Sequence, residues 1–179
     1  MKDLSATSFG YLIAFLLPGI FGLYALRSWS PQVGVLLQPI LQANASVGPS
    51  FIFLVVAIGI GVCLSGVRFF ILERGVYRKY CLDEKLYVGM DEKRLAIHRA
   101  IVEEHYRYHQ FYGNCAIALI ILFAGSLWHL HANWSCGQIL GWTVAFIAFL
   151  LLLERSAKDA FTKYIKKCNN LPTQNGATK

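Results

Sequence analysis

The amino-acid sequence predicts an all-α membrane protein with four transmembrane helices. Two long stretches, residues 28–67 and 108–153, contain no Asp, Glu, Lys or Arg, although charged residues are frequent elsewhere. A soluble domain needs ionic groups over its surface, whereas a charge at the centre of a bilayer costs at least ~2.5 kcal/mol. The composition agrees, because 56% of the residues are hydrophobic and 15% are charged, against about 25% charged in soluble proteins. Each uncharged stretch is therefore expected to belong to a membrane hairpin.

Four runs of apolar residues have the length of a transmembrane helix, which is about 17–25 residues. They lie at about 8–26, 51–72, 111–131 and 137–153. Pro18 falls within the first run and is expected to kink it, because proline has no N–H to donate to the carbonyl one turn earlier. That carbonyl is expected to find a donor on a neighbouring span. Residues 1–168 are expected to form one transmembrane domain, and residues 169–179 a flexible tail.

The basic residues predict the orientation. All but Lys2, Arg27 and Arg68 of the 17 lysines and arginines lie between the second and third spans or after the fourth, and Arg68 lies near the inner end of the second span. By the positive-inside rule, both termini and the arm at 75–110 are expected to be cytoplasmic. Tyr77, Tyr106 and Tyr164 fall near the inner boundary, where they are expected to anchor the chain in the headgroup layer. The positive charge is explained by this orientation and by anionic lipid, so no nucleic-acid partner is expected.

Two segments outside the spans are informative. Residues 30–50 are uncharged and largely apolar, and they are expected either to lie on the outer leaflet or to re-enter the bundle. In the arm, Asp91 is a good N-cap, and no proline follows before Pro172, which predicts one helix that continues from Asp91 into the third span. Along this helix, pairs spaced four residues apart are expected to attract each other, namely Arg99 with Glu103 and Glu103 with Arg107.

Small and polar residues inside the spans are candidates for helix contacts. Small residues recur at fourfold spacing and are expected to let helices approach closely, either within one bundle or between subunits; they are Ala57, Gly61 and Ser65 in the second span and Gly137 and Gly141 in the fourth. Gln110 and Asn114 lie one turn apart at the start of the third span and are expected to bond to another span. Arg68 lies about one turn inside the membrane, where it is expected to reach towards the headgroups or to line a ring in an oligomer. Its candidate partners are Glu73 and Glu154.

Three histidines raise the question of a metal. His98, His105 and His109 share a broad face of the predicted arm helix, and imidazole is a common ligand of transition metals. No further histidine- or carboxylate-rich motif accompanies them on the same side of the membrane. The sequence also lacks a phosphate-binding loop and a Gly-x-Ser-x-Gly motif, and no acidic residue lies in a span. These observations favour a protein without a cofactor over an enzyme or an ion-coupled transporter.

One stretch resembles other proteins. The run Tyr106-Arg-Tyr-His-Gln-Phe-Tyr112 resembles the Tyr-Arg-Tyr-x-Gln-Phe-Tyr stretch of uncharacterised bacterial four-span inner-membrane proteins, and Phe9-Gly-Tyr-Leu with Leu17-Pro-Gly19 is similar to the same group. The resemblance implies a location in the bacterial cytoplasmic membrane and no established activity.

The first functional hypothesis is a non-enzymatic membrane component, an anchor, sensor or effector subunit. Its cytoplasmic arm would dock a soluble partner or another copy, with Arg99, Glu103 and Arg107 as candidate contacts. A second hypothesis is an oligomeric pore or membrane-disrupting effector, based on the small residues, the outer apolar segment and Arg68. A third, more remote one is a metal-dependent membrane enzyme that uses the three histidines.

Overall fold

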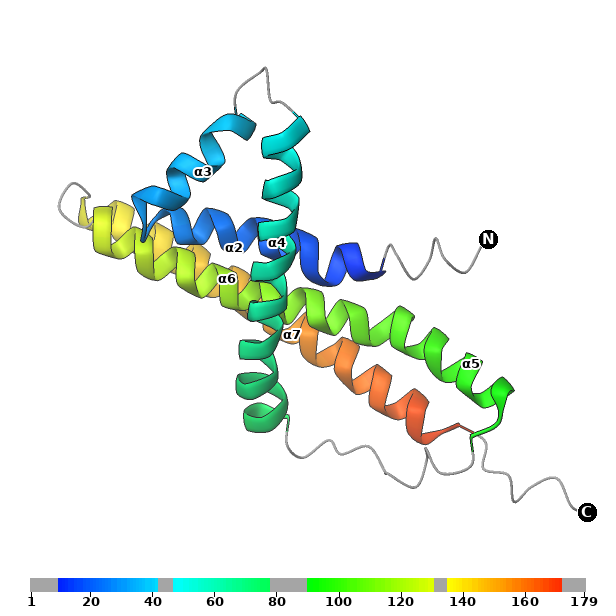
Figure 1. The fold of residues 1–179 in the computed structure, drawn as a ribbon. Coiled ribbons are helices and arrows are strands. Elements are labelled where there is room, and N and C mark those ends of the chain that lie inside the picture. The colour runs from blue at the N-terminus through cyan, green and yellow to red at the C-terminus, as the bar shows by residue number, and fades with distance from the viewer. Residues whose placement is uncertain (1–9, 42–46, 78–89, 131–134, 172–179) are drawn as a thin grey trace, which may run out of the picture.

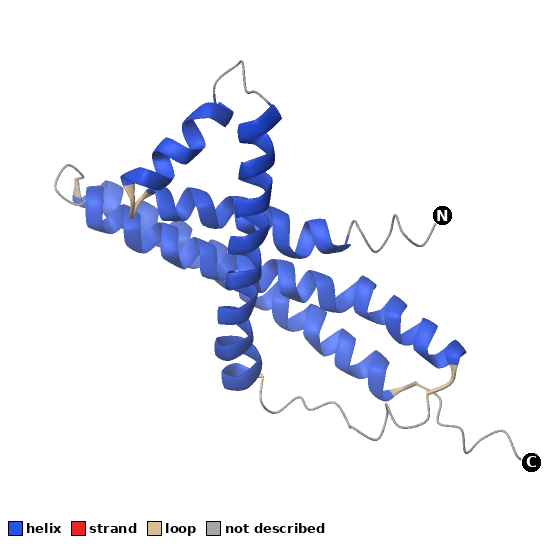
Figure 2. Cartoon of the chain, in the orientation of Figure 1, coloured by secondary structure: helices blue, strands red, loops and turns tan. Residues whose placement is uncertain are grey.

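The computed structural model describes residues 10–41, 47–77, 90–130 and 135–171, and within these ranges every regular element is helical (Figures 1 and 2). The elements are η1 (Leu12–Leu16), α2 (Leu17–Arg27), α3 (Pro31–Leu41), α4 (Val47–Arg68), η2 (Phe69–Val76), α5 (Glu92–Ile101), η4 (Val102–Tyr106), α6 (Arg107–Leu130) and α7 (Cys136–Asn169). Elements η1, η2 and η4 are π-helical segments, which have wider turns than an α-helix.

Three helices in the described ranges are long and apolar enough to cross a membrane. They are Val47–Gly75, Glu92–Trp128 and Cys136–Asn169. The first expected span corresponds to the shorter apolar helix Leu12–Arg27, whose length of about 24 Å is less than the ~30 Å of a typical hydrocarbon core. The structure therefore shows a helical chain of membrane-protein character with three helices of spanning length.

Pro18, where the sequence predicts a kink, is the second residue of α2 and lies next to the junction with the π-helical segment η1. Pro18 cannot donate to the carbonyl of Ala14, four residues earlier. The side chain of Asn114 supplies the missing donor, because its Nδ2 lies 2.9 Å from the Ala14 carbonyl oxygen. The expected donor for the freed carbonyl and the expected bond of Asn114 to another helix are therefore confirmed in a single contact between η1 and α6. The hydrogen bond of Gln110 is instead to Arg107 of its own helix.

Helix α4 crosses α2 and α6 steeply in Figure 1, while α2 and α7 both pack against α6. The sequence predicts the spans but not the angles at which they cross. The cause of the steep crossing is the absence of side chains at the contact: a Cβ at Gly19 would overlap the carbonyl of Ala57, and one at Gly61 would overlap that of Phe15. Backbones that meet this closely are typical of small-residue crossings in membranes.

The expected outer segment contains helix α3. Leu37 of α3 is 1% exposed and packs in one cluster with Leu23 of α2 and Ala57 of α4. This contact places α3 against the pair formed by α2 and α4, while Val35 on its other side is exposed. Residues 42–46 lie outside the described ranges.

A long helical pair extends beyond the apolar part of the chain. Helix α5, η4 and α6 follow one another without a break, as expected, and the Asp91 carboxylate caps the start by accepting from the Arg94 backbone N–H at 2.8 Å. Helix α7 is likewise continuous from Cys136 to Asn169. We call the pair formed by α5, η4 and residues 154–169 of α7 the stalk.

The stalk has its own hydrophobic core. The buried side chains of this core come from α5, from α7 and from the residues that follow η2 and α7. They are Tyr77, Ile101, Phe161, Tyr164, Ile165, Cys168 and Leu171. Tyr77 and Tyr164, expected in the headgroup layer, are 1% and 7% exposed, so this expectation is wrong for both. The reason is that residues 154–169 continue α7 and cover these rings. Leu171 also packs here, just after the point where the tail was expected to begin, and residues 172–179 lie outside the described ranges.

Candidate functional site: a buried ionic cluster at the base of the stalk

Arg68, the last residue of α4, is 2% exposed and points into the protein. Its Nη1 donates to the Glu73 carboxylate at 2.5 Å. Of the two partners that the sequence left open, Glu73 is therefore the one that the structure selects. The two residues are five apart, and the π-helical turn of η2 brings side chains at this spacing to one face. Gly113 of α6 leaves room for the arginine, because a Cβ there would lie 2.6 Å from the Arg68 Cδ.

His109 of α6 joins this ion pair to α7. The imidazole is fully buried, its Nε2 lies 2.8 Å from Arg68 Nη1, and its Nδ1 lies 3.0 Å from the carbonyl oxygen of Ala157. A guanidinium only donates and a backbone carbonyl only accepts. Nδ1 is therefore the donor to Ala157, and the neutral Nδ1–H form, with Nε2 accepting from Arg68, satisfies these two contacts. The Glu73 carboxylate lies further from Nε2, at 3.6 Å.

Tyr106 of η4 completes the cluster. Its hydroxyl donates to the same carboxylate oxygen of Glu73 at 3.1 Å, and the Arg68 guanidinium lies 5.9 Å from the centroid of its ring. We call Arg68, Glu73, Tyr106 and His109 the ionic cluster. It contains one full positive charge on Arg68 and one full negative charge on Glu73. At the edge of an apolar region, either charge alone would be costly to bury, and each compensates the other in the pair.

Aromatic rings tie the ionic cluster to the core of the stalk. Phe161 lies 4.7 Å from His109 between ring centroids, and Tyr77 stacks on Phe161 at 5.2 Å. Tyr106 lies 5.0 Å from Tyr164. The ends of α4 and η2 are therefore connected to both helices of the stalk through one continuous group of side chains.

Arg107 and Asn114 contact the N-terminal helix, and Gln110 is bonded to Arg107. The Arg107 guanidinium lies 4.1 Å from the centroid of the Tyr11 ring and donates to the Gln110 side-chain oxygen at 3.1 Å. Gln110 is 7% exposed and Asn114 is fully buried. These three predicted site residues thus form an internal contact, and a docking surface at Arg107 would have to disrupt it.

The expected charge pairs along the arm are not formed. Within the described part of the chain, no ion pair shorter than 4.0 Å joins Glu103 to Arg99 or to Arg107. The cause is η4, whose wider turn moves side chains four residues apart away from one face. Glu103 lies instead against Gly10, at 2.5 Å from the position of a Cβ on that glycine. Arg99 is exposed.

An ion pair across the stalk was not foreseen. Lys167 of α7 donates to the Glu104 carboxylate at 3.0 Å. This hydrogen bond, together with the nearby His105, lowers the pKa of Glu104, which lies in the polar arm outside the apolar stretch. Both side chains are well exposed, so the pair contributes little to stability. It does show that the two helices of the stalk are matched in register.

The three histidines are not gathered into one site. His98 lies near the Tyr164 ring, His105 is 3.6 Å from the Glu104 carboxylate, and His109 belongs to the ionic cluster with both ring nitrogens engaged. Across the described ranges, no group of three or more His, Cys, Asp or Glu side chains is arranged to hold a metal ion.

The remaining small residues differ in their surroundings. Ala57 and Gly61 lie in the crossing of α2 and α4, and Ser65, one turn further on, is half-buried. At Gly137 and Gly141 of α7, a Cβ would meet nothing within 4 Å. Packing through these two glycines within the chain is thus not seen, and packing between subunits stays a prediction.

Comparisons with protein-family models, curated proteins and solved structures gave no match. The geometry of the stalk and of the ionic cluster is therefore the basis for a function, and the bacterial resemblance stays a prediction.

Proposed function

We propose that the protein is a non-enzymatic integral membrane component whose stalk docks a soluble cytoplasmic partner with an acidic surface. The observation that carries the proposal is the charge of the stalk's outer side. Lys163 pairs with Asp159 and Lys167 with Glu104. Several exposed basic side chains have no ion pair within 4.0 Å among the described residues: Arg99, Arg155, Lys158 and Lys166. An acidic partner would supply the missing counter-charges and would be steered to the stalk by them.

The proposed topology has four spans with both termini in the cytoplasm of a bacterium, in the inner membrane. The contacts of the first described residues support it. Gly10 lies against Glu103 and Arg107, so the N-terminal helix begins at the end of α6 that carries the stalk. The C-terminal end of α7 is part of the same stalk. Both ends of the described chain therefore lie on one side, which is also the side with most of the lysines and arginines.

The length of the stalk favours a protein partner over lipid headgroups. If the fourth span ends near Leu153, Lys166 lies about 20 Å further along the helix at 1.5 Å per residue. Attraction between exposed charges is largely screened beyond ~10 Å at 0.1 M salt. Arg155 and Lys158 can face anionic lipid, whereas Lys166 projects too far from the membrane to be held by it.

Arg68, one of the residues on which the pore hypothesis was based, does not support it. Arg68 is buried and paired within the chain, so it does not line an open surface. The open faces of Gly137 and Gly141 remain available to a second copy, and homo-oligomer formation remains compatible with the docking proposal.

The test is purification from native cells in gentle detergent, with mass spectrometry of the retained proteins, using Lys158→Glu/Lys166→Glu and the control Lys158→Arg/Lys166→Arg. We expect the reversed variant to lose a partner with an acidic surface and the arginine variant to keep it. Labelling of Cys136 from outside the cell checks that both variants keep their topology. Equal recovery in both variants, or recovery that does not fall with added salt, would contradict the proposal.

A further inference from the structure

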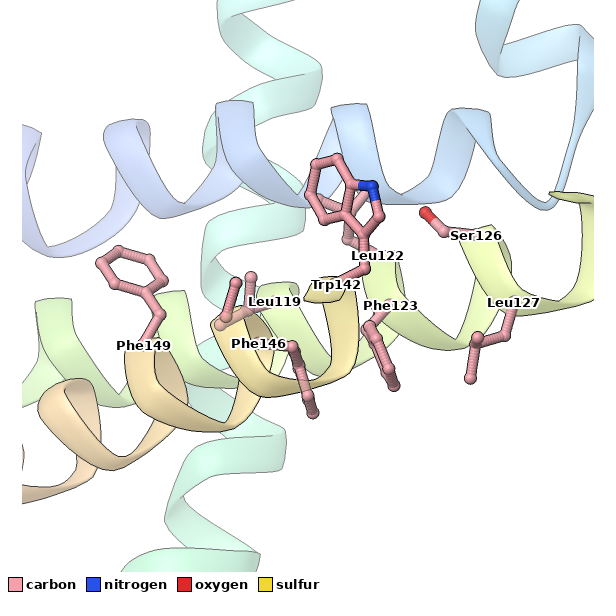
Figure 3. Close-up of a pocket in the computed structure, with 9 residues that line it drawn as sticks. Leu119, Leu122, Phe123, Ser126, Leu127, Trp142, Phe146 and Phe149 are labelled. Carbon is pink, nitrogen blue, oxygen red and sulfur yellow. The ribbon is translucent and has the colours of Figure 1, made fainter. Parts of the chain in front are cut away.

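A hollow with a volume of about 370 Å³ lies between α6 and α7 (Figure 3). Its lining comes from both helices and includes Leu119, Phe123 and Ser126 of α6 and Trp142, Phe146 and Phe149 of α7. All of these residues belong to the uncharged stretch 108–153. The volume falls in the range of small-molecule sites, about 300–1,000 Å³.

The hollow is built by rigid side chains. The rings of Phe123 and Phe146 stack with their centroids 3.9 Å apart and 6° between their planes, which links α6 to α7 beside it. Figure 3 shows these two rings pointing in the same direction. The side chains of Trp142 and Phe149 also extend from α7, but towards a different side of the helix. Trp142 and Phe149 are 60% and 52% exposed, so in the isolated chain the hollow is open and these large rings are uncovered.

We propose that this hollow binds one acyl chain of a membrane phospholipid. The lining is apolar except for the Ser126 hydroxyl and the Trp142 indole N–H, which fits a hydrocarbon occupant. A mouth within the uncharged stretch opens towards the interior of the bilayer, where acyl chains are the available ligands. The interval from Trp142 to Phe149 covers about 11 Å along the helix, less than the thickness of one leaflet of a ~30 Å hydrocarbon core.

The composition of the lining favours an acyl chain over a helix from a second copy. Helices that associate in membranes approach through small residues, and the lining consists mainly of Leu, Phe and Trp side chains. The glycines of α7 that could serve a second copy, Gly137 and Gly141, are not part of it. A flexible chain can follow the irregular surface between these large side chains. The inference depends on the membrane location of α6 and α7 and is independent of partner docking at the stalk.

The experiment uses Trp142 as a fluorescent reporter, in a variant whose other tryptophans, Trp29, Trp128 and Trp134, are replaced by Phe. The detergent-purified chain is titrated with phosphatidylglycerol that carries brominated acyl chains, which quench tryptophan on contact. We expect quenching that saturates near one lipid per chain. Ala145→Phe, which fills the hollow from α7, should weaken this binding at least tenfold, whereas Ala148→Phe, an exposed alanine on the same helix outside the lining, should leave it unchanged.

Native mass spectrometry of the wild-type chain provides a second readout that needs no variant, and one retained phospholipid per chain is expected. Quenching that rises linearly without saturation, or that is equal in the Ala145→Phe and Ala148→Phe variants, overturns the proposal. So does a change from dimer to monomer in Ala145→Phe without a change in quenching, because a second copy would then be the occupant. None of these results bears on the acidic partner, whose test involves only the stalk.

Discussion

Replacement of Glu73 by Gln tests the ionic cluster most directly. The substitution keeps the shape of the side chain but removes the carboxylate that, among the described residues, forms the ion pair with the Arg68 guanidinium, which is 2% exposed. The Tyr106 hydroxyl loses its charged acceptor at the same time. Arg68 would then be a buried cation whose polar contacts, the glutamine oxygen and the His109 imidazole, carry no negative charge.

The expected loss of stability follows from the environment of the pair. Removal of one partner of a fully buried ion pair destabilises a protein by about 3–5 kcal/mol, because the other charge is left uncompensated. The Glu73 side chain is 16% exposed and lies near the end of the apolar stretch, and glutamine retains an acceptor oxygen. We therefore expect a loss of about 2–3 kcal/mol, close to the range for hydrogen bonds that involve charged groups.

The assay is unfolding of the detergent-purified protein by a denaturing surfactant, followed by tryptophan fluorescence. Glu154→Gln is the matched control, because Glu154 is the carboxylate that the sequence offered as the alternative partner. It forms no ion pair within 4.0 Å in the described part of the chain, so its loss should change the free energy of unfolding by less than about 0.5 kcal/mol.

A double variant decides whether the uncompensated charge is the cause. Arg68→Met/Glu73→Gln removes both charges and keeps the volume of the arginine stem. Replacement of a buried ion pair by apolar groups is often nearly neutral, so the double variant should be more stable than Glu73→Gln alone. If the double variant is less stable than the single one, or if Glu154→Gln has as large an effect as Glu73→Gln, the reasoning about the cluster is refuted.

Three further predictions follow from other contacts. Gly113→Ala should destabilise the protein by about 1–3 kcal/mol, because its Cβ would lie 2.6 Å from Arg68 Cδ. The control Gly66→Ala, on an open face of α4, should be neutral or slightly stabilising. Equal effects of the two substitutions on the unfolding midpoint would contradict this prediction. Asn114→Leu should destabilise by about 0.6–2 kcal/mol by leaving the Ala14 carbonyl without its donor, and Pro18→Ala, which restores a backbone N–H, should reduce that loss in a double-mutant cycle. If copies pack through the open glycines of α7, Gly141→Leu should lower the oligomeric state in light scattering, while Gly59→Leu, on an open face of α4, should not.

The contact between Asn114 and Ala14 shows what the sequence can and cannot reveal. The sequence identified both halves of it, a carbonyl freed by Pro18 and a buried amide that needs a partner, because each follows from local chemistry. Their pairing depends on how η1 lies along α6, and the two residues are 100 positions apart. That register is set by packing, which no local pattern encodes.

The ionic cluster was predictable only in part, for a different reason. Arg68 drew attention because charges are rare in apolar stretches, but its choice of Glu73 depends on the π-helical turn of η2. In an ordinary α-helix a residue five positions away lies on a different face, so Glu154 was an equal candidate. His109 was considered as a metal ligand because of its spacing from the other histidines, and its actual contact with Ala157 required the unforeseen continuation of α7.

The charge balance of the cluster explains why Arg68 need not extend to the headgroups. Arg68 and Glu73 carry opposite charges, and the neutral forms of Tyr106 and His109 suit their hydrogen bonds to Glu73, to Arg68 and to the Ala157 carbonyl. The group as a whole therefore has no net charge, which is the condition for burial beside hydrocarbon. The same four side chains come from η2, η4, α4 and α6, and His109 adds a bond to α7. The stalk and α4 are thus joined by directional polar contacts, which constrain their relative position more tightly than apolar contacts would.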